Sequence, residues 1–272
     1  MPLYWDLQGA DTPEELGATF GDAVLDAAET LSRLGLDPDR LADLDLDSAA
    51  ERLRTGLVSR GRTLLLLGDE AEELVTLGLR HGELLGELGR LLAGDGVRAV
   101  LVASVRLAAL ADRGGEVAGL LELLSPPRYL PPLGDFDAAA LVRQEQLRAA
   151  ARPGLSAPQV ETICGLCGNH PFLLQLLGKR VLESGEVERA ADELHHDRVL
   201  HHLFTVDLGL LAPEERGLLA ALARGEAAGG SAARLTSLGL VRPGPDGGLR
   251  VGNEFLKRWL ASTSPDPHAT LT

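Results

Sequence analysis

The chain has 272 residues, of which 45% are hydrophobic and 24% charged, and its formal net charge is −14. This composition excludes a disordered or fibrous chain, and the chain is long enough for two domains. The negative charge disfavours nucleic acid as a partner, because an acidic surface repels a phosphate backbone.

The sequence also indicates where the protein works. No apolar run reaches the ~20 residues that a membrane span needs. The opening residues, MPLYWDLQGAD, lack the basic and apolar regions of a secretory signal. We therefore expect a cytoplasmic protein without a membrane partner.

Residues 1–134 alternate between helical patterns and short apolar runs. Strands are expected at 3–8, 63–67 and 97–104, with a further peripheral candidate in the proline-rich stretch PRYLPPL at 127–133. Helices are expected after a Thr12/Glu15 capping box and a Ser48/Glu51 capping box, and at 70–92, 105–112 and 116–124. Unbroken apolar strands separated by helices are typical of a parallel sheet buried on both faces, so this region is predicted to be α/β.

Residues 135–204 read as helices only, with segments expected at 136–150, 157–167, 170–184 and 187–203. The pair Cys164 and Cys167 lacks the further ligands of a zinc site, and we interpret both as structural. The cluster HHDRVLHH, from His195 to His202, is interpreted as a solvated helix face in preference to a metal site.

Residues 205–262 follow the order helix, helix, hairpin, helix, which is the order of a winged helix. The hairpin is expected in LVRPGPDGGLRVG, where the turn is rich in glycine. The tail, residues 263–272, has no apolar periodicity and is expected to be disordered.

An acidic pair follows the apolar run LLLLGDE. Asp69 and Glu70 leave the strand at the carboxyl edge of the predicted sheet, which is where ligands bind in such folds. One carboxylate there can hold Mg²⁺ through water while the next polarises an attacking water, as in a Walker B site. The alternative is that Asp69 only caps the next helix.

Two further segments offer polar groups. The run VLVASVR places Ser104 and Arg106 at the end of the next strand, where they can contact a phosphate. The alternative is a helix-capping serine and a solvated arginine. In GNHPFLLQ, Gly168, His170 and Pro171 begin a helix; the alternative is an ordinary helix start with a surface histidine.

The order of these motifs resembles the AAA+-like P-loop ATPases of the STAND class. LLLLGDEAEEL resembles their Walker B segment and VLVASVR their sensor 1 strand, with Arg106 at the phosphate-sensing position. GNHPFLLQ resembles the Gly-x-Pro motif of their helical lid, which packs near adenine. The resemblance implies an incomplete parallel sheet flanked by helices, then a helical lid and a C-terminal winged helix.

The sequence departs from that family at the phosphate loop. It contains no G-x-x-x-x-G-K-[ST] motif, and LYWDLQ resembles the strand that normally follows the P-loop helix. We therefore expect a truncated or degenerate module in which ATP or ADP and Mg²⁺ bind only if a P-loop is supplied, with weak or no hydrolysis by this chain.

Three functions remain open. The first is a nucleotide-dependent signalling or regulatory switch, with Asp69 and Glu70 as the catalytic pair. The second is a non-catalytic adaptor that binds proteins, and under either reading we expect a protein partner or self-association. The third is a winged-helix transcription regulator, for which the single Arg234 in SAARLTSLGL is a poor reading surface.

Overall fold

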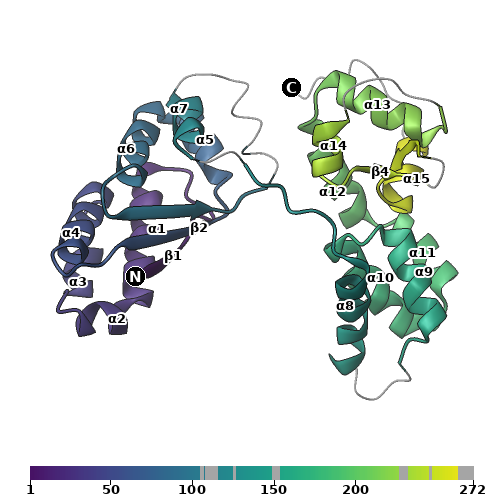
Figure 1. Cartoon of the computed structure of the whole chain (residues 1–272), viewed down its shortest axis with the longest axis horizontal. Coiled ribbons are helices and arrows are strands. Elements are labelled where there is room, and N and C mark those ends of the chain that lie inside the picture. The colour runs from purple at the N-terminus through teal and green to yellow at the C-terminus, as the bar shows by residue number, and fades with distance from the viewer. Residues whose placement is uncertain are drawn as a thin grey trace. The chain divides into compact units, whose positions relative to one another are not determined.

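The computed structural model describes residues 1–104, 107, 116–124, 127–148, 154–226, 232–244 and 247–262. The chain divides into two compact units, Met1–Pro127 and Arg128–Thr272, and each is described here by itself (Figure 1). The division lies on the N-terminal side of Gly134, the residue at which the sequence placed a boundary.

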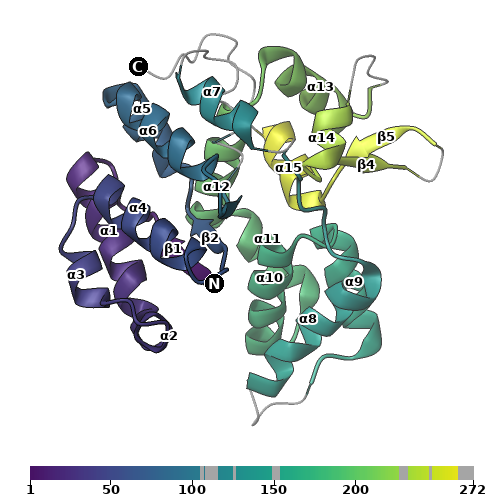
Figure 2. The same cartoon turned by 60° about the vertical axis from the view of Figure 1, so that its left-hand side comes forward.

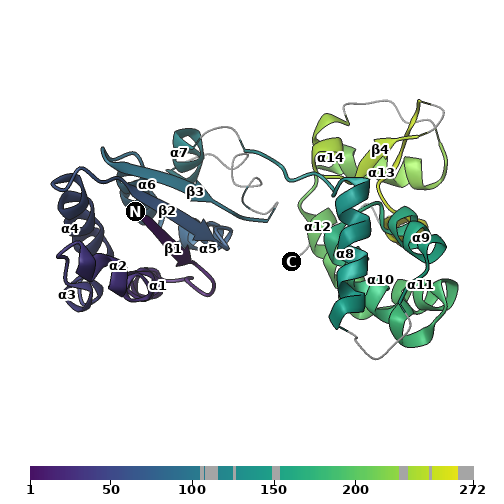
Figure 3. The same cartoon turned by 60° about the horizontal axis from the view of Figure 1, so that its bottom comes forward.

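The first unit is α/β and contains a parallel sheet of three strands in the order β1-β2-β3. Its elements are β1 (Pro2–Asp6), α1 (Pro13–Asp26), α2 (Ala28–Arg33), α3 (Pro38–Ala42), α4 (Leu46–Val58), β2 (Leu64–Asp69), α5 (Glu73–Arg80), α6 (Gly82–Leu92), β3 (Val97–Leu101) and α7 (Glu116–Leu123). The strands lie side by side in Figure 3, and Tyr4, Leu67 and Val100 stand at the same level of the sheet.

The helices of this unit cover one face of the sheet. Helix α1 contacts β1, α4 contacts β2 and α6 contacts β3, and all three lie on the same side of the strands (Figure 2). The handedness of parallel crossovers explains this arrangement. Two successive right-handed connections that advance in the same direction place their helices on the same face.

The covered face carries the core, and the other face is bare. Leu3, Trp5, Leu64 and Leu66 are buried on the covered face, and the Trp5 indole donates to Thr19 Oγ1 at 2.9 Å. On the other face, the side chains of Tyr4 and Val100 are 55% and 52% exposed. The expectation of a sheet buried on both faces is therefore wrong for the described residues.

Several local expectations also need correction. Residues 127–133 form no strand, because prolines at 127, 131 and 132 lack the N–H that a ladder requires. The expected helix at 70–92 divides at His81, whose ψ of 60° is not helical. Helix α4 is capped by Asp45, which accepts from the Ser48 N–H at 2.9 Å, and not by Ser48 itself. The helix expected at 105–112 lies outside the described residues.

The second unit is mainly helical. Its elements are α8 (Asp135–Arg148), α9 (Ala157–Cys167), α10 (Pro171–Ser184), α11 (Val187–His195), α12 (Arg198–Gly209), α13 (Pro213–Ala223), α14 (Ala233–Ser237), β4 (Val241–Pro243), β5 (Leu249–Val251) and α15 (Glu254–Ser262). Strands β4 and β5 pair antiparallel as a hairpin. The helix expected at 187–203 divides because Asp197 starts a new one, accepting from the Val199 N–H at 2.7 Å. None of the helices in the described ranges is long and apolar enough to cross a membrane.

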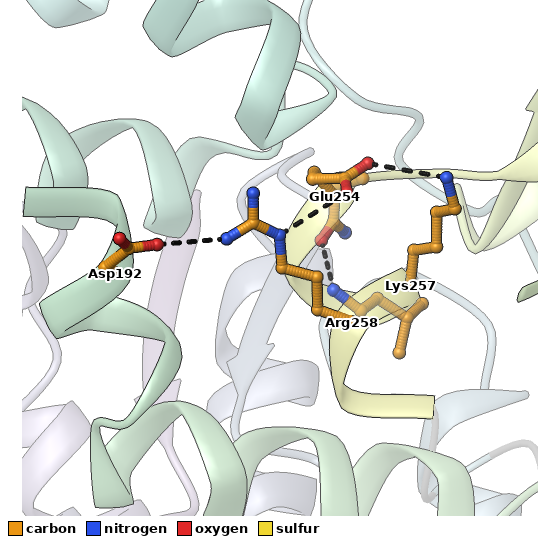
Figure 4. A network of polar contacts seen from close by, with 6 residues as sticks. Asp192, Glu254, Lys257 and Arg258 are labelled. Atoms are coloured by element: carbon orange, nitrogen blue, oxygen red, sulfur yellow. Dashed lines mark hydrogen bonds and ion pairs between the residues drawn. The ribbon is translucent and has the colours of Figure 1, made fainter. Parts of the chain in front are cut away.

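The last helix, α15, is held to the helical layer by both apolar and ionic contacts. Phe255 and Leu256 are buried in one core together with residues of α9, α10 and α11. On the surface, Arg258 contacts Asp192 of α11 at 3.2 Å and Glu254 of its own helix at 3.4 Å (Figure 4). Helices α9, α10, α11 and α15 therefore belong to one packed unit.

Candidate functional site

The carboxyl edge of the sheet gathers acidic side chains from two strands. Asp6 ends β1 and Asp69 ends β2, and the parallel register sets them opposite each other. Both lie on the bare face, because residues two apart along a strand share a face and Tyr4 reaches Asp69 on that side. The edge expected from the sequence is therefore present, with Asp6 as an additional acid that sequence reasoning missed.

Asp69 is held in place by two hydrogen bonds. Its Oδ2 accepts from the Tyr4 hydroxyl at 2.9 Å, and its Oδ1 accepts from the Glu70 N–H at 3.0 Å. Bonding to the carboxylate and its negative charge raise the pKa of Tyr4. Asp69 does not cap helix α5, whose N-cap position is Glu72. The capping alternative for Asp69 is therefore wrong.

Glu70 is exposed and occupies a strained backbone conformation. Its φ of +52° lies in the left-handed region, which side chains with a Cβ rarely adopt. The pKa of Glu70 is raised, first by the charge of Glu72 and then by burial and by the charges of Asp69, Asp6 and Glu73. The turn after β2 thus holds a carboxylate among other carboxylates, an arrangement that favours a bound cation or proton.

Ser104 lies beside this turn, and Glu72 connects the two. The Ser104 N–H donates to Glu72 Oε2 at 3.1 Å, and the Ala71 N–H donates to the Val102 carbonyl at 3.0 Å. The structure therefore brings Ser104 to the same edge as Asp69 and Glu70. Glu72 is buried and was not predicted; its only sequence signal was its place in the acidic run GDEAEE. Arg106 lies outside the described residues.

The GNHP segment belongs to the second unit and forms the turn between α9 and α10. Gly168 ends α9 with a φ of +58°, and His170 and Pro171 are the N-cap and first residue of α10. A Cβ at Gly168 would lie 2.0 Å from the Gly252 carbonyl oxygen, so this glycine is required by the approach of the hairpin. Asn169 donates to Asp135 Oδ1 at 2.8 Å, which ties the turn to α8.

His170 is the polar group of this turn with an unused atom. Its side chain makes no capping hydrogen bond, and its Nδ1 is buried without a partner among the described residues. Burial lowers the pKa of the imidazole, so the ring is neutral near pH 7. In a neutral imidazole each ring nitrogen either donates or accepts one hydrogen bond, depending on the tautomer, and Nδ1 of His170 has this capacity unused.

Metal sites built from protein ligands alone are absent from the described residues, which contain no group of three or more His, Cys, Asp or Glu placed to hold an ion. Two histidines of residues 195–202 bond to backbone instead: His196 Nδ1 lies 2.8 Å from the Asp192 carbonyl oxygen, and His201 Nε2 lies 2.9 Å from the His195 carbonyl oxygen. Cys164 and Cys167 are free thiols whose pKa values are raised by burial. A magnesium ion would need ligands other than protein.

The carboxyl edge of the sheet nevertheless has carboxylates that could hold Mg²⁺ through water. Each oxygen of Asp69 accepts one hydrogen bond from the protein, and a carboxylate oxygen has room for a second donor. Mg²⁺ keeps several of its waters and is usually held by one or two carboxylates together with phosphate oxygens. Asp69 and the neighbouring Asp6 fit that role.

Comparison with known proteins bears on the fold. No protein-family model matches the chain, and no curated protein matches it. Among solved structures, a Walker-type ATPase of Pyrococcus abyssi aligns with a TM-score of 0.60 and 16% identity, over 96% of this chain and 84% of that one. The ORC2 protein of Aeropyrum pernix, solved in ADPNP–ADP complexes, aligns at a TM-score of 0.47 and 14% identity, over 96% and 78%; this similarity is too low to support an inference.

At 16% identity the similarity establishes the fold alone, and it spans nearly the whole chain. It confirms the coarser part of the expectation, an α/β architecture followed by helices, as in that Walker-type ATPase. The chain therefore shares the fold of a Walker-type ATPase.

Proposed function

We propose that the protein is a nucleotide-responsive regulatory switch of the AAA+/STAND kind, with weak or no ATP hydrolysis of its own. Asp69 holds Mg²⁺ through water, with Asp6 beside it, and Glu70 occupies the position of the acid that would polarise an attacking water. The observation that carries the proposal is the meeting of Asp6, Asp69, Glu70 and Ser104 at the carboxyl edge of a parallel sheet.

The charges of this edge make the magnesium ion necessary for nucleotide binding. The carboxylates of Glu72, Asp69 and Asp6 surround Glu70, and they raise its pKa because they repel its charge. A triphosphate would meet the same repulsion. A divalent cation between the carboxylates and the phosphates reverses the sign of the interaction, so binding should depend on Mg²⁺.

Weak hydrolysis follows from what the sequence provides for phosphates. A P-loop cradles them with backbone N–H groups and a lysine, and none of the 272 residues form a G-x-x-x-x-G-K-[ST] motif. Without that cradle the γ-phosphate is not fixed in line with an attacking water, and positioning supplies most of the catalysis in phosphoryl transfer.

The second unit would supply the response to nucleotide. In this proposal, the turn of Gly168, His170 and Pro171 belongs to a lid that responds to nucleotide, as the resemblance to the STAND family implies. The elements from α13 to α15 form the winged helix, which shares a core with the lid helices. A movement of the lid would therefore carry the winged helix with it.

Calorimetry on the whole chain tests the proposal. We expect ATP or ADP to bind with a dissociation constant on the order of a millimolar, only when Mg²⁺ is present. Asp69→Asn should abolish this binding, whereas Asp22→Asn, at an exposed position on α1, should leave it unchanged. No heat at millimolar ATP with Mg²⁺ would refute nucleotide binding. Turnover on the order of one per second or faster that disappears in Glu70→Gln would refute the claim of weak or absent hydrolysis.

A non-catalytic protein-binding adaptor is the second candidate function. The bare face of the sheet favours it, because Tyr4, Val100 and Val102 are each more than half exposed. Exposed apolar side chains that form one patch are typical of protein–protein contact surfaces. Absence of nucleotide binding together with a protein partner at this face would establish the adaptor.

A DNA-reading winged helix is the third candidate, and the contacts of its arginines weigh against it. Arg234 on the five-residue helix α14 is paired with Glu215 at 3.2 Å. Arg242 is partly buried and its pKa is lowered by burial and by Arg250. A salt-dependent shift of duplex DNA at moderate salt would reverse this ranking.

A further inference from the structure

Strand β3 is an edge of the described sheet, and its outward backbone groups can be identified. The Leu64 N–H donates to the Gly96 carbonyl and the Val102 N–H donates to the Gly68 carbonyl, both at 2.8 Å. In a parallel ladder every second residue turns its N–H and C=O toward the same neighbour. Residues 96, 98, 100 and 102 therefore face β2, whereas Ala99 and Leu101 direct their N–H and C=O groups away from the sheet.

This edge carries little of the usual protection against strand pairing, since Arg98 is its one charged residue. Residues 97–104, VRAVLVAS, contain no proline, glycine, lysine or acid. The opposite edge differs, because β1 begins with Pro2 and ends with Asp6. Proteins normally protect exposed edges with charge, proline or bulges. Val100 and Val102 add exposed apolar side chains to the β3 edge, at 52% and 51%.

The edge is complementary to itself in one register. If two β3 strands run antiparallel around a twofold axis at Val100, Ala99 of one copy lies opposite Leu101 of the other. Both residues turn their backbone groups outward, so these positions become hydrogen-bonded pairs. Val100 then faces Val100 of the second copy at a position without backbone hydrogen bonds, where side chains approach most closely.

The local charges permit this register. Arg98 is the only charged residue between 97 and 104, and it lies opposite Val102 of the second copy. The two Arg98 side chains are then four residues apart along the strands, roughly 13 Å, which exceeds the Debye length of about 8 Å at physiological salt. The aliphatic stem of each arginine can cover a valine.

We propose that β3 is a homodimerisation edge, at which two copies of the chain pair their β3 strands antiparallel about Val100 and join their sheets into one. The pairing satisfies the outward groups of Ala99 and Leu101 and covers part of the bare face at Val100 and Val102. It is a closed, isologous contact, so it ends at a dimer. It does not depend on nucleotide binding.

Sedimentation velocity of the whole chain tests the dimer. We expect a dimer at tens of micromolar protein, without nucleotide. Ala99→Pro should give a monomer, because it removes an outward N–H and leaves the ladder to β2 intact. Leu79→Lys, at a residue of α5 that is 63% exposed, is the matched control and should remain dimeric. A monomeric wild-type chain, or a folded Ala99→Pro variant that remains dimeric, would overturn the proposal.

Cysteine crosslinking tests the register and decides the matter if Ala99→Pro fails to fold. In a Cys164→Ser background, Val100→Cys should oxidise to a disulfide-linked dimer, because the two side chains are direct neighbours. Val102→Cys should not, because two copies of residue 102 lie roughly 13 Å apart, beyond the ~7 Å between Cα atoms that a disulfide can bridge. Equal crosslinking at both positions, or crosslinking at neither, would rule out this pairing.

Discussion

The carboxylate of Glu72 accepts a hydrogen bond from the Ser104 N–H, with 3.1 Å between Oε2 and N, and so ties the end of β2 to the end of β3. Among the described residues, Glu72 is the one charged residue that is buried. Glu72 therefore has a structural role in the candidate site, because its buried carboxylate holds the segment after β2 against the segment after β3.

We predict that Glu72→Ala destabilises the fold by about 1–3 kcal/mol, because it removes a charge-assisted hydrogen bond in a buried setting. Glu72→Gln retains an acceptor oxygen and should cost less. Glu72→Gln should also lower the pKa of Glu70, since Glu72 is the largest cause of its elevation. Urea unfolding and NMR titration of the carboxyls measure the two effects, with the exposed Glu83→Ala as control.

Glu70→Gly should stabilise the protein by about 1 kcal/mol. Glycine adopts the φ of +52° without the steric cost that a side chain meets there. It also removes a carboxylate that its neighbours repel. Thermal unfolding at pH 7 checks this, and a lower melting temperature would show that the turn is not strained. Under the proposed function, a gain in stability here identifies a residue retained for its chemistry.

Two glycines with positive φ provide a matched pair. Gly185→Ala places its Cβ in open space, so we expect only the conformational cost of roughly 1 kcal/mol. Gly168→Ala places its Cβ 2.0 Å from the Gly252 carbonyl oxygen and should be several times more costly. Chemical denaturation of the two variants gives the comparison. Equal losses would mean that the hairpin can move away from the α9–α10 turn.

The attachment of α15 should depend on its apolar face and not on its ion pairs. Phe255 is 2% exposed, and Phe255→Ala is expected to cost about 3–5 kcal/mol. The Arg258 side chain is 42% exposed and that of Asp192 is 73% exposed, so Arg258→Ala should cost less than about 1 kcal/mol. Unfolding free energies of both variants test this ranking, and a larger loss for Arg258→Ala would contradict it.

Acidification should weaken the second unit through His195. Burial lowers the pKa of His195, as do His196, Arg258 and His201, while Asp192 opposes them. The unfolded chain then binds the proton more readily than the native one, so stability is unaffected above the ordinary pKa of about 6.5 and falls as the pH drops below it. His170 acts in the same direction.

The urea midpoint of the whole chain at pH 7.5 and at pH 5.5 measures this loss. We expect His195→Gln to reduce the difference between the two midpoints. His202→Gln, at an exposed position of α12, is the control for the loss of a histidine as such. If the difference between the two midpoints were the same in His195→Gln as in the unmodified chain, His195 would not contribute to the loss of stability in acid.

Local sequence signals were reliable where short-range contacts decide the structure. Thr12 caps α1 by accepting from the Glu15 N–H at 3.2 Å, as the capping pattern predicted. Gly185 ends α10 in the left-handed conformation. The Ser48/Glu51 pattern failed because Asp45, three residues earlier, offers a better acceptor to the same Ser48 N–H.

The sequence by itself determined the alternation of strands and helices, the acidic exit at Asp69 and Glu70, and the turn at Gly168, since each depends on residues a few positions apart. Only the tertiary structure decided that Tyr4 holds Asp69 across 65 residues, that Glu72 holds Ser104 across 32, and that the helices leave one face of the sheet bare. Local patterns record hydrogen bonds and periodicity within one element. Which elements become neighbours depends on how the whole chain buries its apolar surface, and that is not a property of any one segment.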